Sequence, residues 1–126
     1  MIKPILKYLD IIEIKDDSKG FLARGAAYIG EDEVEGVEYF YFRVMSTERL
    51  LSILSEDKII DGRATFIAHT FNATVIEERI NEILADSIRP TWDEVAKAIN
   101  RHLEWEYDNI KYETIEQALE RIKSDD

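Results

Sequence analysis

The spacing of the apolar residues changes along the chain from a period of two to a period near 3.6, and this change constrains the fold most. Apolar and aromatic residues alternate with polar ones in three early segments, 5–14, 21–29 and 37–45, which predicts β-strands. From residue 73 the spacing is helical, with apolar side chains at Ile76, Ile80, Ile83 and Leu84. Strands followed by helices predict an α+β fold: an antiparallel sheet of about four strands with helices packed on one face.

The sequence around the third strand predicts its connection and its buried face. Gly30 and Gly36 enclose a charged segment, and glycine permits the positive φ that a hairpin loop needs. In 37–45 the phenylalanines and Val44 alternate with tyrosines and Arg43. We therefore expect the phenylalanine face to pack in the core and the tyrosine face to stay partly hydrated.

The later connections carry helix-capping signals. Ser46 or Thr47 is expected to cap a short helix, and another strand is predicted at 63–71. Thr91 and Glu94 have the spacing of a capping box. The apolar stripe of the helix that follows this box comprises Val95, Ala98, Ile99, His102 and Leu103. A last helix is predicted at 114–123.

Composition limits the class of protein. The 126 residues include no cysteine, and 27 acidic against 16 basic residues give a net charge of −11. No linker or repeat divides the chain, so one domain is expected over 1–126. The charge disfavours nucleic acid and anionic membranes as partners. Without a signal peptide or an apolar span, the chain is expected to be cytoplasmic.

Two acidic clusters are the candidate partner-binding residues. The first falls within eight positions and consists of Glu31, Asp32, Glu33, Glu35 and Glu38. The second alternates with Trp105 and Tyr107 and consists of Glu104, Glu106 and Asp108. A solvated surface that keeps the protein soluble is one interpretation. The other is a surface complementary to a basic protein, since opposite charges speed encounter and reject wrong partners.

The sequence gives little support to catalysis or to cofactor binding. His69 and His102 are far apart and form no metal motif, and no glycine pattern matches a phosphate loop. We therefore predict no catalytic residue, metal site or cofactor. Besides a protein whose acidic surface binds and inhibits one basic partner, two other functions stay open. A nucleic-acid mimic would need acids spaced like phosphates, and a small hydrolase would need two carboxylates converging in an apolar pocket.

Five segments together resemble the immunity protein family eight: 27–30, 35–44, 46–50, 90–96 and 105–107. The resemblance extends from about residue 21 to residue 108 and departs at the end, where the helix at 114–123 looks like an addition. It implies a protein of a bacterial polymorphic-toxin or contact-dependent inhibition system. Such proteins bind the C-terminal toxin domain delivered by sister cells, often a nuclease, and block it without chemistry. Together with the charge, it implies steric and electrostatic occlusion of a cognate toxin domain that has a basic surface; the oligomeric state is left open.

Overall fold

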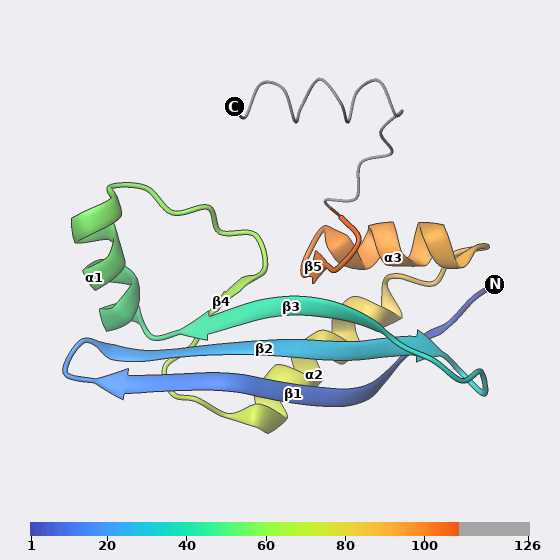
Figure 1. Ribbon diagram of the computed structural model, residues 1–126, viewed down its shortest axis with the longest axis horizontal. Coiled ribbons are helices and arrows are strands. Elements are labelled where there is room, and N and C mark those ends of the chain that lie inside the picture. The colour runs from blue at the N-terminus through green and yellow to red at the C-terminus, as the bar shows by residue number, and fades with distance from the viewer. Residues whose placement is uncertain (109–126) are drawn as a thin grey trace, which may run out of the picture.

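The computed structural model describes residues 1–108 as five strands and three helices. In chain order these are β1 (Pro4–Asp17), β2 (Gly20–Glu31), β3 (Glu38–Met45), α1 (Thr47–Asp57), β4 (Thr65–Ile67), α2 (Ala73–Ala85), α3 (Trp92–Asn100) and β5 (Glu104–Trp105) (Figure 1). The helix predicted at 114–123 lies outside the described residues. Elsewhere the switch from strands to helices follows the predicted order.

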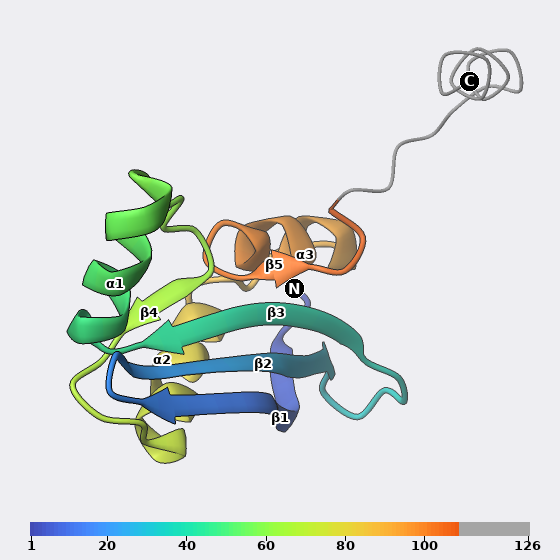
Figure 2. The same cartoon turned by 60° about the vertical axis from the view of Figure 1, so that its left-hand side comes forward.

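The sheet is built on an antiparallel meander of β1, β2 and β3. The free edge of β3 pairs with two short strands: β4 along 43–45 and β5 along 40–41. Figure 2 shows β4 and β5 on this same side of β3. The predicted α+β fold, with a mostly antiparallel sheet, is confirmed.

The strand predicted at 63–71 is much shorter and differs in direction. β4 spans only Thr65–Ile67 and runs parallel to β3, because α1 carries the chain back between the two strands. Its length is limited by its partner, since β3 ends where Ser46 caps α1 and accepts the Arg49 amide hydrogen bond. Ser46 is one of the two caps that the sequence predicted.

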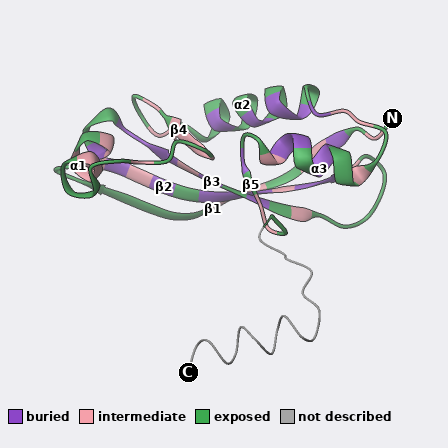
Figure 3. Ribbon diagram, turned by 90° about the horizontal axis from the view of Figure 1, so that it is seen from above, coloured by how far each residue is buried: buried purple, intermediate pink, exposed green. Residues whose placement is uncertain are grey.

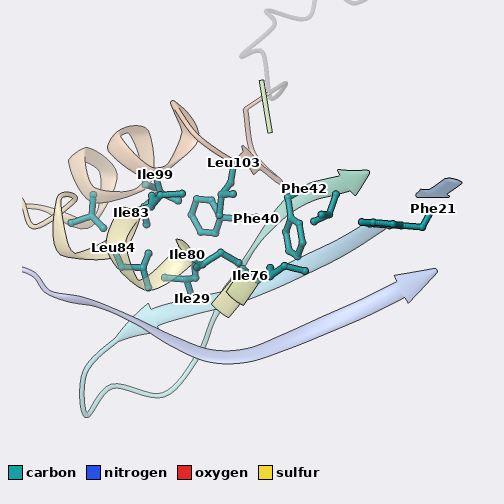
Figure 4. Close-up of a cluster of buried hydrophobic side chains, with 14 residues drawn as sticks. Phe21, Ile29, Phe40, Phe42, Ile76, Ile80, Ile83, Leu84, Ile99 and Leu103 are labelled. Atoms are coloured by element: carbon teal, nitrogen blue, oxygen red, sulfur yellow. The ribbon is translucent and has the colours of Figure 1, made fainter. Parts of the chain in front are cut away.

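The hydrophobic core lies between the sheet and two helices. Figure 3 shows α2 and α3 on one side of the sheet. Figure 4 shows isoleucines of α2 reaching side chains of β2 and β3. The fully buried positions include Ile29, Phe40, Ile80, Val95, Ile99 and Leu103. All four apolar positions predicted for α2 are buried, as expected for an amphipathic helix.

One residue that the sequence placed on the apolar stripe of α3 is not buried. His102 is exposed, whereas Val95, Ala98, Ile99 and Leu103 are buried. The helical spacing does not hold at His102 because α3 ends at Asn100. The capping box at the other end of the helix is confirmed, with Thr91 and Glu94 each accepting a backbone hydrogen bond from the other.

Candidate functional site

The loop between β2 and β3 projects from one end of the sheet, and its backbone is held from β1. The Lys7 amine donates hydrogen bonds to the carbonyl oxygens of Val34 and Gly36, the latter at 3.3 Å. Gly30 permits this arrangement, because a Cβ there would collide with the Gly36 carbonyl oxygen. Gly36 itself has φ of +100°, which favours glycine. The loop is therefore ordered through its backbone.

The acidic side chains of this loop take no part in these contacts. Asp32, Glu33 and Glu35 are exposed and Glu31 is half-buried. Within residues 1–108, none of these four carboxylates has an ion-pair partner within 4.0 Å. A partner with basic side chains can thus approach them without displacing an internal ion pair.

A hollow of about 410 Å³ lies beside the loop. Its lining combines acidic and apolar groups: Glu31, Glu35 and Glu38 with Ile29, Val34, Val37 and Trp92. Val34 and Val37 are 49% and 37% exposed, which is high for valine in a loop with ordered backbone. A lining that combines apolar groups with carboxylates suits the long side chain of lysine or arginine, whose stem is apolar and whose head is charged.

Glu38 has an internal role as well as a place in this hollow. One of its carboxylate oxygens accepts hydrogen bonds from the indole nitrogens of Trp92 and Trp105, both at 2.8 Å. Both tryptophans are half-buried and pack against the core. Glu38 therefore ties the start of α3 and the strand β5 to the start of β3.

The second acidic cluster lies along the edge of β3. The Glu106 carboxylate accepts a hydrogen bond from the Tyr39 backbone amide, and the Glu106 amide donates to the Tyr39 carbonyl oxygen at 2.9 Å. Asp108 accepts from Asn100 at 2.7 Å and from Arg63 at 3.1 Å, and these two hydrogen bonds lower its pKa. Glu104 is exposed at the other end of the segment.

The two predicted clusters are thus brought to the same end of the sheet, where Trp105 joins them through Glu38. They differ in what their carboxylates do. Glu38, Glu106 and Asp108 hold elements of the fold together. The others have no side-chain hydrogen bond within 1–108; these are Glu31, Asp32, Glu33, Glu35 and Glu104.

The sequence did not reveal a row of tyrosines on the face of the sheet away from α2 and α3, which we call the open face. Tyr8, Tyr28 and Tyr39 come from three adjacent strands, with ring centroids 5.3 and 4.6 Å apart. The Tyr28 hydroxyl donates to Asp10 at 3.0 Å, and this hydrogen bond raises the pKa of Tyr28. Register shifts in β1, which bring Tyr8 opposite Tyr28, cannot be read from simple alternation.

Groups of His, Asp and Glu that could hold a metal ion do not occur within the described part of the chain. No helix of that part is long and apolar enough to cross a membrane. The described residues offer an ordered loop, exposed acids and a hollow lined by both acidic and apolar groups.

Comparison with known proteins identifies the family. No curated protein and no solved structure matches this chain. The family described as Immunity protein 8 matches residues 7–110, a range that begins within β1 and includes every later helix and strand described here. The match spans most of the chain, so the resemblance seen in the sequence is confirmed and membership implies an immunity protein of a polymorphic toxin system. The protein belongs to the Immunity protein 8 family.

Proposed function

We propose that this protein binds the cognate toxin domain of its own system in the cytoplasm and blocks it by occlusion, without chemistry. The loop acids Glu31, Asp32, Glu33 and Glu35 supply a charged part of the contact surface. Glu38 and the segment 104–108 border it. The partner presents a basic surface to this end of the sheet, as the active face of a nuclease would.

The observation that carries this proposal is the hollow beside an ordered loop, with a lining that combines acidic and apolar side chains. Lys7 fixes the loop backbone, so little conformational entropy is lost when a partner binds. The exposed valines offer apolar area, and the carboxylates offer long-range attraction to basic groups. A standard interface covers about 800 Å² per partner, so the loop would form one part of a larger surface.

The test is a triple charge reversal in the loop, Asp32→Lys, Glu33→Lys and Glu35→Lys, in the full chain. The partner is the toxin C-terminal domain encoded beside the gene of this protein. We expect affinity to fall by roughly tenfold or more, chiefly through slower association, and the salt dependence of association to weaken. Protection of cells that express the toxin domain should fall with it.

The matched control reverses Glu56, Glu77 and Glu78, which are exposed on α1 and α2. It changes the net charge by the same amount, so it separates a local contact from the overall charge. Equal effects of the two triple variants would contradict the loop assignment. Failure of the unaltered protein to bind or protect against this toxin domain would contradict the proposed function itself.

A further inference from the structure

A second hollow lies on the open face, at the edge of β3 between β4 and β5. It has a volume of about 610 Å³. Three arginines contribute to its lining, Arg24 from β2, Arg43 from β3 and Arg63 from the connection before β4, together with Tyr41. Basic side chains therefore outnumber the acidic ones in this lining, three to two, in a chain whose net charge is −11.

Two of these arginines are cross-strand neighbours on the adjacent strands β2 and β3. Arg24 and Arg43 are directly opposed in the β2–β3 register, where like charges repel. Arg43 is held by neutral acceptors, the Thr65 hydroxyl at 2.8 Å and the Asp61 carbonyl at 3.2 Å, which fix its guanidinium but leave its charge in place. Arg24 is exposed and makes no side-chain hydrogen bond within residues 1–108.

The acidic residues near Arg24 and Arg43 form no ion pair with them within residues 1–108. Glu13 is opposite Arg24 on β1, yet no ion pair within 4.0 Å joins them in the described chain. Asp61 and Glu104 line the hollow, but among the described residues the one lining arginine with a carboxylate partner is Arg63, which pairs with Asp108 at 3.1 Å. Arg24 and Arg43 therefore present two charged guanidinium groups that have no carboxylate of residues 1–108 within ion-pair distance.

We propose that this arginine hollow receives a carboxylate side chain of the toxin domain. Arginine forks match carboxylates in geometry and can bind them through paired hydrogen bonds. Tyr41 in the wall is 39% exposed, and tyrosine and arginine are the residue types that dominate binding energy at protein interfaces. This inference rests on the proposed function and adds a contact of opposite charge to the acidic loop.

The two contacts are separated along β3. From Val37 at the loop to Arg43 in the hollow is six residues, or roughly 20 Å of extended strand. That separation fits within one interface of standard size. A partner would need a basic group and an acidic group at a matching spacing, which fixes its orientation as well as its identity.

The test is Arg24→Glu, with Arg24→Gln as a second variant that places no added carboxylate beside Glu13. We expect toxin affinity to fall by roughly tenfold or more for Arg24→Glu and by less for Arg24→Gln, with the dissociation rate raised. The melting temperature should stay near that of the unaltered protein, because the new attraction to Arg43 offsets repulsion by Glu13. The control is Arg101→Glu, an exposed arginine just after α3, which should leave affinity unchanged.

The outcomes separate this inference from the proposed function. If the unaltered protein binds the toxin domain and both Arg24 variants bind equally well, the arginine hollow is not a contact, while the proposed function stands. If Arg24→Glu weakens binding and the loop variant does not, the inference stands and the loop assignment falls. Inorganic phosphate is the remaining probe: resonance shifts in the hollow on adding phosphate, with toxin binding insensitive to Arg24, would identify a site for small anions and overturn the proposal.

Discussion

Replacing Glu38 with alanine removes the acceptor shared by two indole nitrogens. Each lost hydrogen bond to a charged group costs about 1.5–3 kcal/mol when its partner is left buried. Trp92 and Trp105 are half-buried, so water replaces part of each bond and the lower end of that range applies. The expected loss of unfolding free energy is about 3 kcal/mol for the two bonds together.

The measurement is equilibrium urea unfolding followed by far-ultraviolet circular dichroism. At the slope typical of a small domain, the midpoint should fall by about 1–2 M urea. Glu38→Gln keeps an oxygen acceptor and should lose only about 1 kcal/mol. The control is Glu35→Ala in the loop just before β3, an exposed acid for which a change within about 0.5 kcal/mol is expected.

The reasoning is refuted if Glu38→Ala unfolds with the same midpoint as Glu35→Ala. A double-mutant cycle with Trp92→Phe adds a direct check. The loss caused by Glu38→Ala should be smaller in the Trp92→Phe background, because one of the two hydrogen bonds is already absent.

Three further predictions concern the core, the loop and the pH dependence. Ile80→Ala should cost about 2–5 kcal/mol in thermal or urea unfolding, because the side chain is 0% exposed between α2 and the sheet, and a loss below 1 kcal/mol would contradict the packing. Gly30→Ala should shift the loop amide resonances and cost about 1–3 kcal/mol, because a Cβ would collide with the Gly36 carbonyl. Stability should fall at both pH extremes. The pKa of Asp108 is lowered by its hydrogen bonds, so its contribution to stability is present above its unfolded pKa and is lost as pH falls through the folded value. The pKa of Tyr28 is raised, so its contribution to stability is present below about 10 and is lost as pH rises through the folded value. Asp108→Asn and Tyr28→Phe should flatten the acid and alkaline sides of a melting-temperature profile respectively, and unchanged profiles would contradict these assignments.

The periodicity of apolar residues was sufficient to predict the main strands and helices, because it reflects the burial of one face of each element. The alternation in 37–45 correctly separated Phe40 and Phe42 from Tyr39 and Tyr41, and the helical spacing correctly selected the buried residues of α2. It failed at β4, where three residues are too few to show a period and the direction depends on the path of α1. It also failed at His102, because α3 ends at Asn100, two residues before this position.

The candidate site was predictable only in part, because a sequence shows charges but not their neighbours. The exposed loop acids were evident from composition and turn residues. Glu38 accepts hydrogen bonds from Trp92 and Trp105, which lie 54 and 67 residues further along the chain, so no local sequence pattern encodes these contacts. The opposition of Arg24 and Arg43 likewise depends on strand register, which a hairpin loop of irregular length leaves open.

The two tryptophans of the chain donate hydrogen bonds to one carboxylate, so tryptophan fluorescence reports on a single region of the protein. Trp92 lines the hollow beside the acidic loop, so a ligand that enters there changes the surroundings of one indole directly and of the other through Glu38. Intrinsic emission therefore reports events at this end of the sheet, without any attached label. By the same logic, an event confined to the far end, near α1, should leave the emission spectrum unaltered.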